Sequence, residues 1–157
     1  MTDNKLQKQF RNEVTHLQMQ MQDQADGVSV VVGTKEDPIV SDSELIPIKH
    51  YFMDGVYVRE MTMKKGIAVV GAIHKHLHMC FLLTGRITVI NEEETIDHIA
   101  PCFIVSTPGI KRVLYAHEDS MWFNTHKNPS NTEDVKQLER DIVAVTYEEY
   151  EEYIKNK

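Results

Sequence analysis

The stretch Gly71-Ala72-Ile73-His74-Lys75-His76-Leu77-His78 places three of the chain's eight histidines at alternate positions, between two apolar runs. Side chains two residues apart in a strand point the same way, so the three imidazoles are expected to share one face or one strand end. Histidine is the commonest metal ligand and changes charge near neutral pH. The trio therefore indicates metal, acid–base or anion chemistry, although exposed histidines on a solvated strand would give the same pattern.

Short apolar or alternating runs continue on both sides of this stretch, from Val28 to about His126. Turn pairs such as Asp54-Gly55 and Thr84-Gly85 separate them. We predict strands at residues 28–32, 45–48, 55–63, 67–73, 79–83, 86–90, 103–106, 111–116 and 121–125. Many short strands joined by tight turns are typical of a β-sandwich or barrel.

Helical periodicity marks both ends of the chain. Over residues 3–25, apolar side chains recur at helical spacing until Asp26-Gly27 stops the pattern: Leu6, Phe10, Val14, Leu17 and Met21. After Pro129, Ser130 with Glu133 and Thr146 with Glu149 form two capping boxes, which predict two short helices within residues 131–155. The sequence thus predicts one mainly β domain over residues 1–157: a helix, a barrel over residues 28–126 and a helical tail.

Composition limits the partners. The net charge is −7, and duplex nucleic acid requires clustered Lys and Arg, so we expect no such partner.

The N-terminus lacks the apolar core of a signal peptide and no run is long enough to span a membrane, so we expect a cytoplasmic protein. Cys80 and Cys102 lack CxxC spacing, which predicts reduced core thiols. The apolar stripe of the first helix suits a homodimer or higher homo-oligomer.

The spacing around the histidine stretch resembles the first motif of cupins, which are small β-barrel proteins. That motif has glycine, five residues, histidine, one residue, histidine, three or four residues, glutamate, six residues and glycine. Here Gly66 and Gly85 frame the same spacing, with Ala72, His74 and His78 at the three ligand positions. The resemblance implies a cupin-like double-stranded β-helix, or jelly-roll, barrel.

The second cupin motif is proline, one residue, glycine, two residues and histidine, and residues 107–112 resemble it with Arg112 at the histidine position. In more detail, residues 57–60, 71–78, 109–112 and 116–119, followed by Trp122, are similar to small cupin-like proteins of tailed phages and prophages. This resemblance covers most of residues 48–126.

Carried over to this chain, the cupin pattern makes His74 and His78 ligands of one divalent ion: iron, manganese, nickel or zinc. His76 is an added candidate ligand, because a turn between residues 75 and 77 would bring it inward. Arg112 argues against a bare ion, since a guanidinium and a divalent cation repel each other unless an anion lies between them. Either the metal carries an anionic ligand that faces Arg112, or the basic residues bind an anion directly.

Other residues near the barrel mouth are candidates for binding that ligand. Lys111 and His76 would add positive charge, and so would Arg59 if the pair Tyr57 and Arg59 faces inward rather than Val56 and Val58. Further candidates are Tyr115, His117 and Trp122, although strand parity places position 117 opposite to position 112, and Trp122 suits the core as well as a stacking role. We expect His16, His50 and His98 at the surface, and leave His126 open.

Two classes of function follow. The first is a phage-type binding protein that captures a small anionic ligand, for example a nucleotide derivative, to sequester or sense a host signal such as one used in defence. The second is a metal-dependent isomerase, lyase or dioxygenase acting on a small molecule. Because the glutamate and the second-motif histidine of cupins are replaced, and no general base occupies a matched position, the sequence favours binding.

Overall fold

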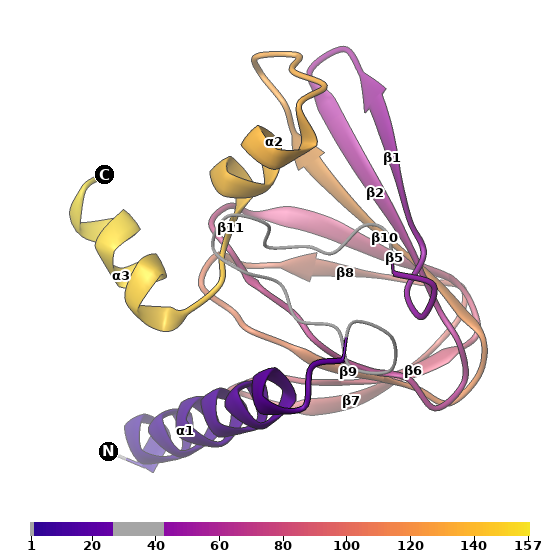
Figure 1. Cartoon of the computed structure of the whole chain (residues 1–157). Helices are drawn as coiled ribbons and strands as arrows, with labels where there is room; N and C mark the ends of the chain where they lie inside the picture. The colour runs from indigo at the N-terminus through magenta and orange to yellow at the C-terminus, as the bar shows by residue number, and fades with distance from the viewer. Residues whose placement is uncertain (1, 27–42) are drawn as a thin grey trace.

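The computed structural model describes residues 2–26 and 43–157, which fold into two facing antiparallel sheets and three helices (Figure 1). The larger sheet has the order β1-β2-β10-β5-β8, from Ile48–Met53, Val56–Met63, Ser120–Lys127, His78–Thr84 and Cys102–Ser106. The smaller sheet has the order β3-β9-β6-β7, from Ala68–Val70, Val113–Ala116, Arg86–Ile90 and Thr95–Ile99. A short pair joins β4 (Ile73–His74) to β11 (Val143–Ala144).

The two strand orders define a jelly roll. The chain folds back at the β6–β7 hairpin, so that β5 pairs with β8, β3 with β9 and β2 with β10. With β1 set aside, each sheet then contributes four strands to a two-layered barrel, which is the architecture shared by cupins. The predicted fold class, a mainly β jelly roll with an N-terminal helix and two C-terminal helices, is confirmed.

Alternation along the strands fills the space between the sheets with apolar side chains. In β5, for example, Cys80 and Leu82 are buried, whereas Met79 and Leu83 face solvent. The residues buried in this core are Met63, Cys80, Leu82, Ile87, Val89, Leu114, Ala116 and Trp122. Gly85, between β5 and β6, has a φ of +86°, a conformation that an L side chain rarely adopts. This turn holds the two sheets together at one end of the core.

Several predicted elements need correction. The strand predicted at residues 45–48 is wrong, because the strand starts at Ile48 and runs to Met53. The run at 67–73 divides into β3 and β4. Strand β7 was not predicted, and the predicted strand at 28–32 lies outside the described residues.

The helical tail begins four residues later than the first predicted capping box. Helix α2 (Val135–Ile142) is capped by Asp134, whose side chain accepts a hydrogen bond from the backbone of Gln137. Helix α3 (Tyr147–Lys155) is capped by Thr146, as predicted, through a hydrogen bond from the backbone of Glu149. The Ser130–Glu133 box is therefore wrong and the Thr146–Glu149 box is confirmed.

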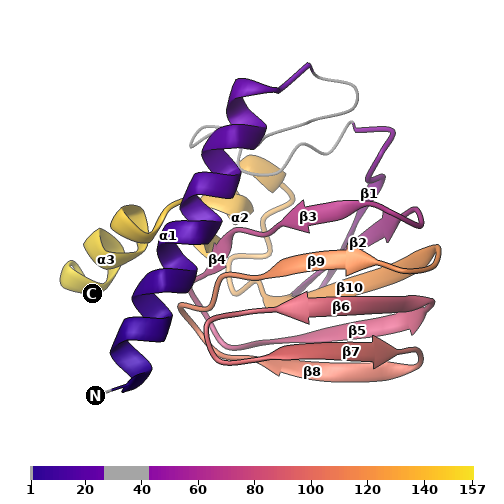
Figure 2. The same ribbon diagram turned by 90° about the horizontal axis from the view of Figure 1, so that it is seen from below.

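Helix α1 (Thr2–Asp23) crosses one end of the barrel, on the same side as α2 and α3 (Figure 2). Val14 packs against Ile73, Ala144 and Tyr147, so the helix joins the barrel to the C-terminal segment. Only part of the predicted apolar stripe is used, because Leu6 is well exposed. No described helix has the combination of length and apolar character that crossing a membrane requires.

Lys111 fastens α1 to the C-terminal segment. Lys111 is 1% exposed, and its ammonium donates hydrogen bonds to Gln18 Oε1 and to the carbonyl of Val145, both at 2.8 Å. Burial lowers the pKa of Lys111 to about 8, from an ordinary value of 10.5. The folded protein therefore releases this proton at a lower pH than the unfolded chain does.

This pKa shift predicts a pH-dependent stability. Between pH 8 and 10.5 the unfolded chain holds the proton that the folded protein has lost, so the free energy of unfolding rises with pH. Between pH 7.5 and 9.5 the free energy of unfolding of the wild type should rise by roughly 2 kcal/mol more than that of Lys111→Met. The other titrating groups are present in both proteins, so their effects cancel in this difference. Urea unfolding at several pH values measures the difference. A difference that stays constant with pH would contradict the assigned environment of Lys111.

Candidate metal centre

Three histidines from three strands meet inside the barrel: His74 on β4, His78 on β5 and His126 on β10. One ligand atom from each lies within 4.8 Å of the other two. The ring centroids are 4.0 Å apart for His74 and His78, 4.6 Å for His78 and His126, and 5.2 Å for His74 and His126. We call these three side chains the histidine cluster.

Strand pairing explains why His126 joins the cluster. Strand β10 runs antiparallel to β5, with Thr125 opposite Met79, so the residues next to this pair, His126 and His78, come together on the inward face. Parity agrees, because Trp122 and Asn124 are buried on the same face of β10. From the sequence alone, the place of His126 is open. The signal that could have placed it in the interior is its even spacing from Trp122, which puts both side chains on one face of the strand.

Burial keeps the histidine cluster neutral. It lowers the pKa of His78 to about 4 and that of His126 to about 2, and it holds the pKa of His74 well below the ordinary value of 6.5. The positive charge of Arg59 lowers all three values further, and that of Arg112 lowers those of His74 and His78. Neutral imidazoles carry the lone pairs that a metal ion requires.

The hydrogen-bonding state of the nitrogens fits a divalent metal. The Nε2 atoms of His74 and His126 are buried and have no hydrogen-bond partner among the described residues, although His74 as a whole is only half-buried. His78 Nδ1 lies 3.2 Å from the carbonyl oxygen of His76, to which it can donate, so Nε2 is left as the ligand atom. Buried polar atoms without partners are rare, and a metal ion would satisfy them.

Arg112 is buried beside the histidine cluster. Its Nη1 donates to Ser106 Oγ at 2.6 Å, and none of the described carboxylates forms a salt bridge with it. The guanidinium has five N–H donors, so one hydrogen bond leaves most of its capacity for a ligand. Burial lowers the pKa of Arg112, but such a group stays charged in proteins. Arg112 and Ser106 therefore form a subsite suited to a small anion.

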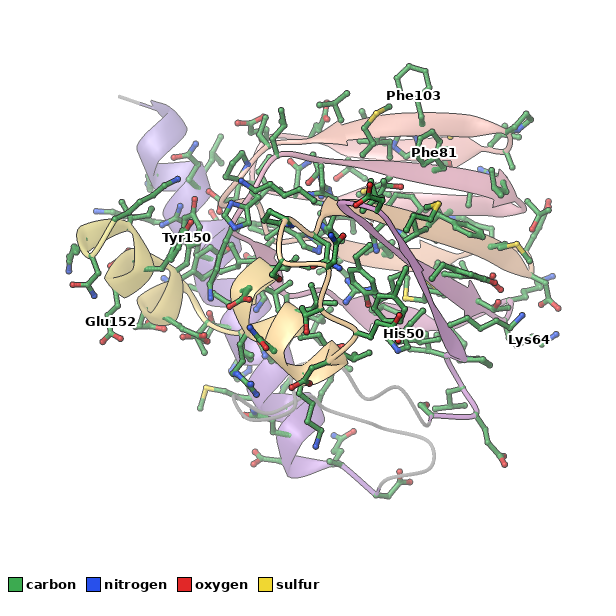
Figure 3. The ribbon with its side chains drawn as sticks, turned by 90° about the horizontal axis from the view of Figure 1, so that it is seen from above. His50, Lys64, Phe81, Phe103, Tyr150 and Glu152 are labelled. Carbon is green, nitrogen blue, oxygen red and sulfur yellow. The ribbon has the colours of Figure 1, made fainter. Side chains whose placement is uncertain are left out.

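Tyr57 and Arg59 are buried and face inward. Of the two alternatives for β2, the inward pair is therefore this polar pair and not Val56 and Val58. Tyr57 is fully buried, its ring stacks on His126 with centroids 6.0 Å apart, and its hydroxyl lies 2.7 Å from His50 Nδ1. Burial raises the pKa of Tyr57 to about 12. His50, expected at the surface, is half-buried at the edge of this network (Figure 3).

Cys80 lies next to the histidine cluster on β5. Its Sγ is 3.4 Å from His78 Nε2 and donates to Asn124 Oδ1 at 3.1 Å. The same Asn124 oxygen accepts the indole N–H of Trp122 at 3.0 Å. Burial raises the pKa of Cys80 to about 11, so the group is a neutral thiol, as predicted for a reduced core cysteine.

The structure places two predicted site residues outside the barrel interior. His76 does not turn into the histidine cluster, because its ring packs edge-on against Tyr153 of α3, 6.2 Å between centroids. The structure brings His126, and not His76, together with His74 and His78. Lys111 points toward Gln18 and Val145, so its ammonium binds acceptors of α1 and of the C-terminal segment and does not reach the histidine cluster.

Three further candidates also lie away from the histidine cluster. Tyr115 is exposed and contacts His117 edge-on, and His117 Nε2 is 2.6 Å from Thr88 Oγ1, on the outer face of the smaller sheet. Strand parity explains this, because Arg112, Leu114 and Ala116 face inward. Trp122 is a core residue whose edge is bonded to Asn124, so no ring face is free for stacking.

No protein-family model and no curated protein matches the sequence. Solved structures similar to this chain include a cupin superfamily protein from Desulfitobacterium hafniense, with 10% identity over 62% of this chain and 95% of that one, at a TM-score of 0.49. An RmlC-like cupin from Shewanella frigidimarina has 13% identity over 57% and 79% of the two chains, at a TM-score of 0.48.

A third similar structure is KdgF from a Halomonas species, with 15% identity over 52% of this chain and 79% of that chain, at a TM-score of 0.47. Several of the similar structures are described as cupins.

Proposed function

We propose that the barrel binds one divalent metal ion on His74, His78 and His126, and holds a small anionic molecule beside it through Arg112 and Ser106. The observation that carries this proposal is the convergence of three neutral imidazoles within 4.8 Å, two of them with buried Nε2 atoms that lack partners among the described residues. Three imidazoles are enough for an open metal site. When bound, the ion supplies a positive centre that attracts or polarises an anion.

The charges around the histidine cluster support an anionic ligand. Arg59 and Arg112 are both buried, and their charges act on the same histidines. Adding a divalent cation would add positive charge beside these two arginines, and burying such charge without a counter-ion is costly. A carboxylate or phosphate would offset that charge and accept hydrogen bonds from the Arg112 fork. Capture of a host signal by a phage protein remains our prediction for the biological role.

A metal-dependent small-molecule enzyme is the second candidate. The observation in its favour is that the histidine cluster supplies three ligands, which leaves a coordination position for substrate. The ring of Tyr57 stacks on His126, and the Tyr57 hydroxyl contacts His50, which is half-buried. These two residues would orient a substrate or hold a proton at the Tyr57 oxygen.

Arg112→Met tests the anion subsite. We expect inorganic phosphate to raise the melting temperature of the metal-loaded wild type, and Arg112→Met to lose this stabilisation, because charge-assisted hydrogen bonds of about 2 kcal/mol each would be absent. Phosphate affinity should fall roughly 10- to 100-fold. Differential scanning fluorimetry over a series of phosphate concentrations measures the melting temperature and the phosphate affinity. Elemental analysis of untagged protein measures the bound metal.

Arg140→Met is the matched control, since Arg140 is an exposed arginine on α2. It should keep the full phosphate response. Equal responses of the wild type, Arg112→Met and Arg140→Met would remove the anion subsite from the proposal. Substoichiometric metal in protein supplied with iron, manganese, nickel or zinc would remove the metal centre.

A further inference from the structure

We propose that Cys80 is a fourth ligand of the same ion, bound as a thiolate. This inference rests on the proposed metal site and names a ligand that lies outside the cupin motif positions. Cys80 follows His78 by two residues on β5, so its side chain shares the inward face, and it is 1% exposed.

The contact with His78 has the dimensions of a shared ion. Because His78 Nδ1 is held by the carbonyl oxygen of His76, Nε2 is the atom that faces the cluster, and Cys80 Sγ lies 3.4 Å from this atom. Typical bonds are about 2.0 Å from zinc to nitrogen and about 2.3 Å from zinc to sulfur, so both atoms would be able to bind one ion at that separation. The sulfur touches the cluster at the His78 corner.

The rest of the cluster must tighten for four ligands to reach one ion. Cys80 is not among the three side chains whose ligand atoms lie within 4.8 Å of one another, so its sulfur has to approach the other two histidines for all four side chains to bind one ion. The Nε2 atoms of His74 and His126 are buried and have no hydrogen-bond partner among the described residues, so no hydrogen bond has to break for them to bind an ion. Coupling of metal binding to local ordering is common in metal sites.

Coordination by Cys80 also resolves the conflict posed by Arg112. A guanidinium near a divalent cation requires a negative charge between them, and Arg112 and Cys80 interact electrostatically. A thiolate would be that charge. One negative sulfur against a divalent ion and Arg112 leaves the interior positive, so a small anion is still attracted.

The proton balance is simple. On binding, the Sγ–H bond breaks, the proton leaves to solvent and the sulfur lone pair goes to the ion, with no change in oxidation state. Asn124 Oδ1 loses the thiol as a donor but keeps the indole N–H of Trp122. Asn124 Oδ1 therefore still accepts a hydrogen bond after the thiol has bound the ion. A sulfur ligand also makes zinc a better match than manganese.

Cobalt(II) gives a direct test, because a thiolate bound to it produces a sulfur-to-metal charge-transfer band in the near ultraviolet, whereas histidine ligands do not. One equivalent of cobalt(II) is added to metal-free full-length protein, and the absorption spectrum and bound cobalt are measured. We expect the band in the wild type and in Cys102→Ser, and its loss in Cys80→Ser with cobalt still bound.

The controls separate the inference from the proposed function. The sequence has two cysteines, so a band in Cys102→Ser must come from Cys80 even if Cys80→Ser fails to fold. Bound cobalt without the band in the wild type, or a band lost in Cys102→Ser and kept in Cys80→Ser, would overturn the role of Cys80 and leave the histidine site standing. Absence of bound cobalt, with zinc and nickel also unbound, would overturn both.

Discussion

Replacing His126 with alanine is expected to weaken metal binding roughly 100-fold, whereas replacing His76 with alanine leaves the affinity for the metal unchanged. His126 is one corner of the histidine cluster, and its Nε2 has no other partner among the described residues. The His76 ring instead packs on Tyr153 at the surface of the tail. Structural zinc sites are worth about 10–16 kcal/mol over four ligands, so losing one ligand should weaken binding roughly 100-fold.

This pair of variants separates the two possible trios. Both residues are histidines near the same end of the barrel, so a general effect of losing an imidazole would appear in both variants. Isothermal titration with zinc, or elemental analysis after dialysis against a metal buffer, gives the affinities. Retention of metal in His126→Ala together with its loss in His76→Ala would favour the trio of His74, His76 and His78, and would contradict the present geometry.

The second large effect concerns stability. Leu82→Ala is expected to lower the free energy of unfolding by about 2–5 kcal/mol, because it removes a fully buried side chain from the space between the sheets. Leu83→Ala, at the next position of β5, should cost less than about 1 kcal/mol, because Leu83 is 48% exposed. Urea unfolding measures both values, and the difference between them reports the inward and outward faces of one strand.

Equal and large losses would contradict the assignment of the outer face to solvent. Phe103, on β8, and Phe81, on β5, pair on that face, and Phe103 projects away from the barrel (Figure 3). If Leu83→Ala were as costly as Leu82→Ala, the outer face of β5 would be covered in solution. A second copy of the chain is the cover that the prediction of a homo-oligomer would supply.

Local sequence patterns predicted most strands because alternation and turn chemistry act over a few residues. Arg86–Ile90 was predicted with its observed bounds, since the buried Ile87 and Val89 alternate with Arg86 and Thr88. Strand β7 was missed because Ile96 and Ile99 are exposed, so the strand lacks an apolar face that would mark it. Strand β1 was misplaced because Tyr51 and Met53 face outward while His50 is half-buried.

The candidate site was less predictable, because its residues meet through strand pairing over long distances in the sequence. His74 and His78 could be chosen from their spacing. His126 comes from a strand that pairs with β5 across more than forty residues, and nothing near position 126 indicates that partner. The direction of the Lys111 side chain was also unpredictable, because both of its hydrogen-bond acceptors come from segments far away in the sequence, at the helical ends of the chain.

The pairing of β4 with β11 has a consequence for how the site is made. His74 lies in β4, and its partner in the strand pair is Val143 of β11, which follows every strand of the two sheets in the sequence. During synthesis the strands of both sheets are therefore made before the strand that flanks His74. A metal site on the histidine cluster would be complete only after β11 has been made.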